Sequence, residues 1–236
     1  TISLPESARF QNPARPIVAL SPDGTHLVYA VGGGQGVGLL YLRALDQLEA
    51  TPLRGTESAG WPVFSPDGQW IAFWQNGQIK TISVNGGPPV VVGAATSLSG
   101  ATWGEDDTIV FVQDPDDIRR VPGTGGVSGR LLKLEAGQAA YGPQILPGGR
   151  ALLFTLKTGA TWDEAQTVVQ SLDTGKRQVV LPQGSSDARY LQTGHLVYVS
   201  QGTLLAVPFD VATLKVTGGP VPLVDGVRTP NRNASG

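Results

Sequence analysis

Cysteine and methionine are both absent from the 236 residues, and histidine occurs only twice. Without cysteine the chain can form no disulfide, no thiolate metal site and no cysteine nucleophile. Charged residues make up only 15% of the chain and sum to a formal net charge of −2. A chain with so little net charge has no broad field to attract nucleic acid or an anionic membrane, so neither is expected as a partner.

Long hydrophobic runs are missing as well. No stretch of the sequence approaches the roughly 20 apolar residues that a membrane helix requires, and the first residues do not form a basic and then apolar leader. We therefore expect membrane attachment only through a tether outside this chain.

Glycine and proline are abundant instead, with 32 and 18 residues. This is typical of many short strands joined by tight turns, so long helices are not expected. The clearest turn is Ser65–Gly68, in which Pro66 presets φ, Asp67 can bond its own backbone two residues on, and Gly68 tolerates positive φ. Apolar residues precede this turn and the apolar run Trp70–Phe73 follows it, which predicts a β-hairpin.

The same hairpin recurs five times along the chain, at a spacing of 39 to 45 residues. The large apolar residues just before the turns are Leu20, Phe64, Trp103, Ile145 and Tyr190. Those that follow the turns are Tyr29, Phe73, Phe111, Phe154 and Tyr198. A four-stranded unit of this length predicts a blade of a β-propeller, because such a sheet buries both faces only when neighbouring blades stack on it. We expect both sets of residues to pack between blades.

The predicted fold is therefore all-β, with one β-propeller domain of four-stranded antiparallel blades over residues 1–236. Five blades are visible, and we expect them at about 15–59, 60–99, 100–140, 141–188 and 189–228. A single strand at Thr1–Leu4 within residues 1–14 precedes them, and a loop at 229–236 follows them.

The turn Ser65–Gly68 and its counterpart Ser21–Gly24, each followed by an apolar strand, resemble those of the TolB-like, WD40-like β-propeller family. Four further segments are similar to the propeller that follows the membrane segment in many bacterial eukaryotic-like serine/threonine protein kinases; they are Leu40–Asp46, Gly86–Pro88, Gly194–Tyr198 and Leu204–Asp210. The resemblance implies a periplasmic or extracytoplasmic sensor or interaction domain, with the kinase domain N-terminal to this chain. It also implies six blades, the sixth following residue 236 and joined by the strand at Thr1–Leu4; the alternative is that five blades close by themselves.

No catalytic set is found in the sequence. The glycine-rich run Gly32–Gly38 fails the G-x-G-x-x-G spacing and has no helix after it, and no H-R-D or D-F-G occurs, so we interpret it as a flexible loop between strands. The segment Gly126–Arg130 comes closest to the G-x-S-x-G elbow of a hydrolase but ends in arginine. The chain itself is expected to be neither a kinase nor a hydrolase and to need no cofactor; the propeller cap of a prolyl-oligopeptidase-like peptidase, without its catalytic domain, is an alternative.

Metal ligation is not expected either. His26 and His195 occupy aligned places after their turns and lack neighbouring ligands at metal-site spacing. The acidic clusters are Glu105–Asp107 and Asp114–Asp117, and the second lacks the third ligand, the glycine and the distant glutamate of a calcium loop. Both clusters are interpreted as solvated turns.

Propellers bind ligands mostly where the loops between blades converge on the central channel. Here those loops are 54–61, 93–101, 135–142 and 182–189. The candidate ligand-binding residues are Arg15, Glu57, Trp61, Ser97, Tyr141, Trp162, Asp187 and Arg189. Packing between blades is the alternative role for them, and Trp162, in the long connection 157–166, either covers the funnel or folds back on its own blade. The expected partner is a protein or peptide, or a small ligand derived from the cell wall; a structural or oligomerising module is the alternative that an unfinished ring suggests.

Overall fold

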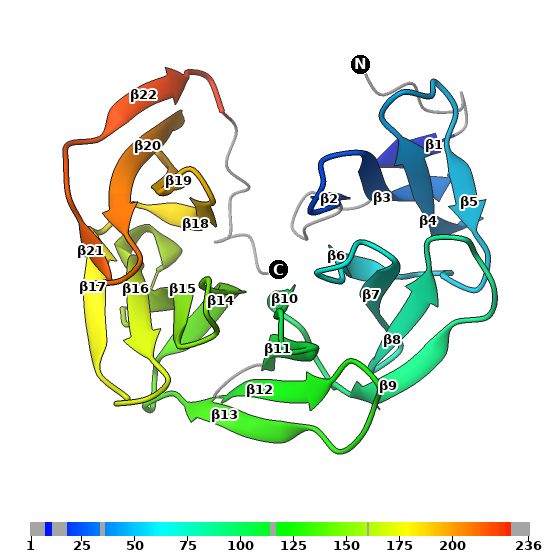
Figure 1. The fold of residues 1–236 in the computed structure, drawn as a ribbon, viewed down its shortest axis with the longest axis horizontal. Helices are drawn as coiled ribbons and strands as arrows, with labels where there is room; N and C mark the ends of the chain where they lie inside the picture. The colour runs from blue at the N-terminus through cyan, green and yellow to red at the C-terminus, as the bar shows by residue number, and fades with distance from the viewer. Residues whose placement is uncertain (1–7, 11–17, 34–35, 114–116, 160, 228–236) are drawn as a thin grey trace.

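The computed structural model describes residues 8–10, 18–33, 36–113, 117–159 and 161–227. Over these residues the chain forms antiparallel sheets arranged side by side around a central axis (Figure 1). The prediction of an all-β propeller with five four-stranded antiparallel blades is confirmed.

The first three blades follow one another along the chain. The first contains β1 (Ala8–Phe10), β2 (Val18–Leu20), β3 (His26–Gly33), β4 (Gly36–Ala44) and β5 (Thr51–Leu53). The second contains β6 (Gly60–Phe64), β7 (Trp70–Gln75), β8 (Gln78–Ser83) and β9 (Val90–Ala94). The third contains β10 (Ala101–Trp103), β11 (Thr108–Gln113), β12 (Asp117–Pro122) and β13 (Gly129–Lys133).

The last two blades continue the ring. The fourth contains β14 (Ala139–Ile145), β15 (Ala151–Lys157), the 3-10 helix η1 (Trp162–Glu164), β16 (Gln166–Ser171) and β17 (Arg177–Leu181). The fifth contains β18 (Ser186–Leu191), β19 (His195–Ser200), β20 (Thr203–Asp210), β21 (Lys215–Val216) and β22 (Val221–Val224). The first and fifth sheets keep four strand positions, because β1 and β2 pair successive parts of β3, and β21 and β22 pair successive parts of β20.

Two details of the first blade differ from the sequence analysis. The strand expected at Thr1–Leu4 lies outside the described residues. The structure has a strand that was not predicted, β1 at Ala8–Phe10, which pairs with Val31–Gly33. The glycine-rich run, interpreted as a loop, contributes to strands: β3 continues to Gly33 and β4 begins at Gly36, with these two glycines paired. The pairing of β3 with β1 and β4 holds these glycines in an extended conformation, although glycine has a low intrinsic preference for β-strands.

The turns form as predicted from their residue types. In Ser65–Gly68 the Gly68 N–H donates to the Ser65 carbonyl at 2.9 Å, and Gly68 has a φ of 70°. The Asp67 carboxylate accepts the Ser65 hydroxyl and the Gln69 N–H. Such a turn returns the chain directly into the next strand, so the first hairpin of each blade ends at its turn. We name the face of the ring at which these turns lie the turn face.

The core consists of four apolar clusters among the described residues, one between each successive pair of blades. The predicted set that follows the turns is buried in every blade; its exposed fractions are 1% for Tyr29, 1% for Phe73, 0% for Phe111, 1% for Phe154 and 6% for Tyr198. Four of these rings, from Phe73 to Tyr198, belong to the clusters that stack one blade on the next. Tyr29 instead stacks on Tyr41 of its own blade, with 6.1 Å between ring centroids.

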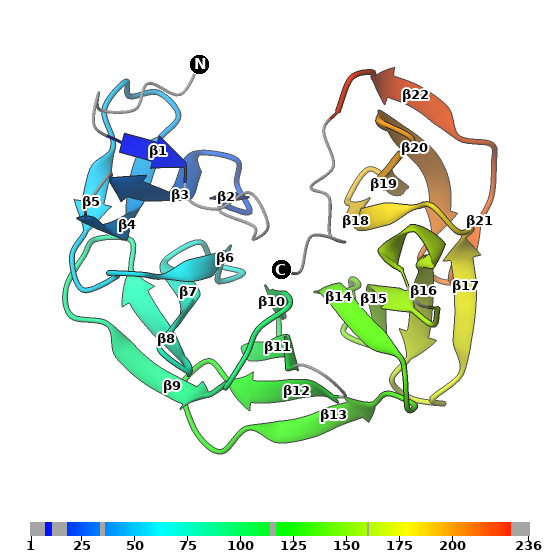
Figure 2. The same cartoon turned by 180° about the vertical axis from the view of Figure 1, so that it is seen from behind.

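The prediction that Leu20 packs between blades is wrong. Phe64, its equivalent in the second blade, is 8% exposed because it packs on the first blade with Val28 and Leu40. Leu20 is 55% exposed. Figures 1 and 2 show the described blades as an incomplete ring, open between β2 on one side and the fifth blade on the other. Leu20 therefore faces a position at which the described chain supplies no preceding blade.

Candidate functional site

The inner strands of all five blades line a cavity on the axis of the ring. Its volume is about 460 Å³, and residues of β2, β6, β10, β14 and β18 contribute to its wall. A second cavity of about 530 Å³ opens at the turn face. Thr102, Trp103, Gln144 and Tyr190 line both cavities. The two are consecutive parts of one axial channel.

One position at the start of the inner strand has a left-handed backbone in four blades; it lies three residues before the aligned apolar residue that precedes the turn. Its φ is 59° at Trp61, 127° at Gly100, 58° at Gly142 and 51° at Asp187. The strand register is irregular at this place in β6, β14 and β18. Such a bulge redirects side chains, and a left-handed tryptophan is costly because its Cβ crowds the following carbonyl. The conformation of Trp61 is therefore held by its surroundings.

Those surroundings are aromatic. The Trp61 ring meets the Tyr141 ring edge to face, with 5.7 Å between centroids, and Tyr141 meets Trp162 in the same way at 6.0 Å. Trp61 and Tyr141 are 6% and 8% exposed. Because Trp61 belongs to the second blade and Tyr141 to the fourth, this contact joins two blades that are not neighbours in the ring. Both residues lie near the start of their inner strands, at the end opposite the turns, and we name this face of the ring the loop face.

Trp162 lies behind this pair. The helix η1 carries it back onto Tyr141 of its own blade, the second of the two arrangements weighed for it from the sequence. The ammonium group of Lys157 lies 5.7 Å from the centroid of the Trp162 ring. This cation–π contact adds to the packing that fixes the ring.

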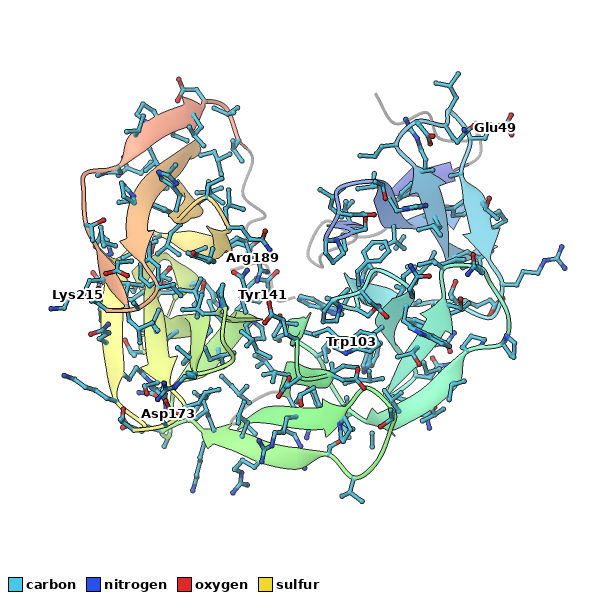
Figure 3. The ribbon with its side chains drawn as sticks, viewed as in Figure 1. Glu49, Trp103, Tyr141, Asp173, Arg189 and Lys215 are labelled. Atoms are coloured by element: carbon cyan, nitrogen blue, oxygen red, sulfur yellow. The ribbon has the colours of Figure 1, made fainter. Side chains whose placement is uncertain are left out.

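Arg189 and Asp187 hold the fourth and fifth blades together at the loop face. The Arg189 guanidinium donates to the Gly142 carbonyl at 3.1 Å and to the Asp187 carboxylate at 2.9 Å. Figure 3 shows Arg189 and Tyr141 near the axis of the ring. A Cβ on Gly142 would lie 3.1 Å from the Asp187 carboxylate, so glycine leaves room for this ion pair.

The remaining predicted site residues lie elsewhere. The Glu57 carboxylate accepts the Gly55 N–H at 3.2 Å, and the Glu57 carbonyl accepts the Gln75 amide at 2.6 Å, so Glu57 shapes the loop between the first two blades. Ser97 is half-buried in the loop before β10. Neither residue lines the channel cavities. Arg15 lies outside the described residues.

Gln144 is a channel residue that the sequence analysis did not select. Its side-chain oxygen accepts the Tyr190 N–H at 2.8 Å, and its side-chain nitrogen donates to the Tyr190 carbonyl at 3.1 Å. The predicted site residues lie mostly in the loops between blades, whereas the channel wall consists mainly of inner strands. The repeat alignment held the signal, since Gln144 directly precedes the aligned residue Ile145.

The described residues contain no group of three or more histidine and acidic side chains that could hold a metal ion. His26 Nδ1 lies 2.8 Å from the Thr25 hydroxyl, and His195 Nδ1 lies 3.0 Å from the Thr193 carbonyl. In the second acidic cluster, Asp117 pairs with Arg119 and Arg130 on β12 and β13. Within the described ranges no helix is long and apolar enough to cross a membrane.

The geometry defines the class of protein as a β-propeller whose inner strands line an axial channel. No family model and no curated protein matches the sequence. Among solved structures, TolB from Acinetobacter baumannii aligns with a TM-score of 0.66 and 19% identity over 90% of this chain and 56% of that chain. A protein described as TolB from Agrobacterium tumefaciens aligns with a TM-score of 0.63 and 18% identity, over 89% of this chain and 80% of that one.

A prolyl endopeptidase aligns with a TM-score of 0.60 and 14% identity over 94% of this chain and 36% of that chain. This chain thus spans a little over half of the A. baumannii TolB chain and about a third of the endopeptidase. At these identities the likeness concerns the fold, which is that of a TolB-like β-propeller.

Proposed function

We propose that this chain is a non-catalytic binding module that holds a peptide segment of a partner protein in its axial channel. The observation that carries the proposal is Trp61, a bulky residue kept at a φ of 59° in the channel wall. Strained backbone of this kind concentrates at binding sites, where surrounding structure offsets its cost. The cavity of about 460 Å³ is within the usual range for ligand sites and has mainly apolar and aromatic side chains.

A binding screen tests the proposal. The probes are N-acetylated, C-amidated peptides, with soluble peptidoglycan fragments as the small-ligand arm, and the readout is the unfolding midpoint of the chain, which a ligand specific to the folded state raises. Trp61→Ala is expected to abolish the shift caused by any bound peptide. Trp70→Ala is the matched control, because Trp70 is 42% exposed and outside the channel.

The outcome has two readings. Loss of the shift in Trp61→Ala but not in Trp70→Ala supports the channel as the site. If Trp61→Ala unfolds the chain, Trp61→Phe replaces it, because phenylalanine keeps an aromatic ring at this position. Equal shifts in the wild type and in both Trp61 variants would overturn the proposal.

The same proposal includes a cellular role as the extracytoplasmic sensor part of a membrane serine/threonine kinase. Its support is the sequence resemblance at Leu40–Asp46 and Leu204–Asp210, together with the TolB-like fold. Protease added to spheroplasts that express the full natural protein should cleave this domain while an N-terminal kinase domain stays protected. Protection of both parts would contradict the role.

A second candidate function is a module that completes its ring with a β-sheet from another polypeptide. The observation in its favour is the open ring together with apolar exposure of β2 beside the opening, where Val18 and Leu20 are 43% and 55% exposed. Unpaired strands and exposed apolar surface promote association. Light scattering should then give dimers or larger species, reduced to monomers by Leu20→Asp; a monomer that unfolds cooperatively would contradict it.

The propeller cap of a peptidase is the remaining alternative. The likeness of the fold to a prolyl endopeptidase supports it. It requires a G-x-S-x-G elbow in a domain outside this chain. Sequencing of the whole gene tests that requirement directly.

A further inference from the structure

The cavity at the turn face has a rim built from one repeated position. The second residue of each of the five turns contributes to it, and these residues are Pro22, Pro66, Glu105, Pro147 and Gln192. The rigid proline rings give three sides of this rim a fixed, uncharged surface. Glu105 takes the place of proline in the third blade, so a carboxylate stands at a position that the repeat elsewhere fills with apolar or neutral side chains.

Charge in this cavity has one sign. Among the described residues that line it, the charged ones are Glu105 and Asp106, and both are exposed. The neighbouring Asp107 carboxylate accepts the Trp103 indole N–H at 2.8 Å, which anchors that ring at the cavity wall. Trp103 and Tyr190 add aromatic surface. Carboxylates beside aromatic rings favour an organic cation, through charge pairing and cation–π contact.

The opposite end of the channel differs. Trp61, which lines the inner cavity, and Tyr141 are in contact at the loop face. Arg189 is the charged residue among the described lining of the inner cavity, and it is paired with Asp187. A ligand that enters the channel from the turn face meets Glu105 and Asp106 first.

From this arrangement we infer that the turn-face cavity binds a lysine or arginine side chain of the peptide held in the channel. The inference rests on the proposed function and names its specificity: a basic peptide. The cavity of about 530 Å³ has room for such a side chain with part of its backbone. The exposure of both carboxylates makes the attraction sensitive to salt, because screening is strong near solvent.

Matched peptides test the inference. The probes are N-acetylated, C-amidated pentapeptides with glycine at four positions and lysine, arginine, acetyl-lysine or leucine at the centre, titrated by calorimetry at low salt. The lysine and arginine peptides are expected to bind about fivefold or more tightly than the acetyl-lysine peptide, and the difference should shrink at high salt. The double variant Glu105→Gln, Asp106→Asn should lose the preference.

The control is the double variant Asp46→Asn, Glu49→Gln, which removes two exposed carboxylates from residues that do not line the channel. Unchanged lysine preference in Glu105→Gln, Asp106→Asn, or an equal loss in the control, would overturn the inference. Binding that depends on Trp61 but not on peptide charge overturns this inference alone. Binding that depends on charge but not on Trp61 overturns the proposed channel site, and absence of binding by every peptide overturns both.

Discussion

The amide of Gln144 joins the fourth blade to the fifth by two hydrogen bonds to the backbone of Tyr190, at 2.8 and 3.1 Å. The side-chain amide thereby links two sheets that are not joined by backbone pairing within the described residues. Because both residues line the channel, this link also fixes the distance between the inner strands of the fourth and fifth blades there.

Gln144→Leu should destabilise the chain by about 1–3 kcal/mol, because it removes two hydrogen bonds from a half-buried site. Urea unfolding measures the change. Gln69→Leu is the control, since Gln69 is exposed in a turn and uses its backbone N–H there. An equal effect of the two substitutions would contradict the role given to Gln144.

Gly100→Ala should cost more than Gly77→Ala. Both glycines have positive φ, 127° and 79°, so each substitution costs about 1–2 kcal/mol in the backbone. A Cβ on Gly100 would also lie 2.7 Å from the Gly142 nitrogen and from Pro143 Cδ, whereas nothing lies within 4 Å of a Cβ on Gly77. The overlap adds about 1–3 kcal/mol. Equal unfolding free energies would show that the third and fourth blades are not in close contact there.

Phe64→Ala should cost about 3–5 kcal/mol, and Leu20→Ala about 0.5 kcal/mol or less, although the two residues are equivalent in the repeat. The reason is the burial of Phe64 against the first blade and the 55% exposure of Leu20. A cost of several kcal/mol for Leu20→Ala would mean that further β-structure covers this face.

The stability of the turns should decrease in acid. Hydrogen bonds from Ser21 and Thr25 lower the pKa of Asp23 to about 2, and a bond from Ser65 lowers the pKa of Asp67 in the equivalent turn. An aspartate in the unfolded chain titrates near 3.9. The folded state therefore gains stability from these carboxylates above about pH 4, and that gain is lost as the pH falls from about 4 to 2.

Urea midpoints measured between pH 5 and pH 2 test this dependence. Asp23→Asn should flatten the decrease, because asparagine does not titrate, and Asp46→Asn serves as the exposed control. An unchanged slope in Asp23→Asn would contradict the assignment.

The repeat made most of the fold predictable from sequence. Proline, aspartate and glycine specify the turns locally, and the large residue after each turn, from Tyr29 to Tyr198, is buried in every blade. Leu20 could not be predicted in the same way, because its burial depends on a neighbouring blade and not on its own strand. The strand β1 and the paired glycines Gly33 and Gly36 were missed because backbone pairing, which has little residue preference, holds them.

The candidate site was predictable in part. Trp61, Tyr141 and Trp162 were selected as aromatic loop residues, and the structure brings them into one cluster. Which blades this cluster would join depends on the bulge at Trp61, and the left-handed φ of a tryptophan has no signal in the sequence. Gln144 and Glu105 were not selected because their place in the channel lining depends on how the blades are arranged around it.

The central claim, that the channel is the binding site, is tested most directly by filling it. Since the chain has no cysteine, Thr102→Cys offers a single thiol where the two cavities meet, and a bulky maleimide can be attached there. The control is Val127→Cys with the same label, at a residue that is 94% exposed. We expect labelling at position 102 to abolish peptide binding and labelling at position 127 to leave it unchanged. Undiminished binding by folded protein labelled at position 102 would contradict the claim.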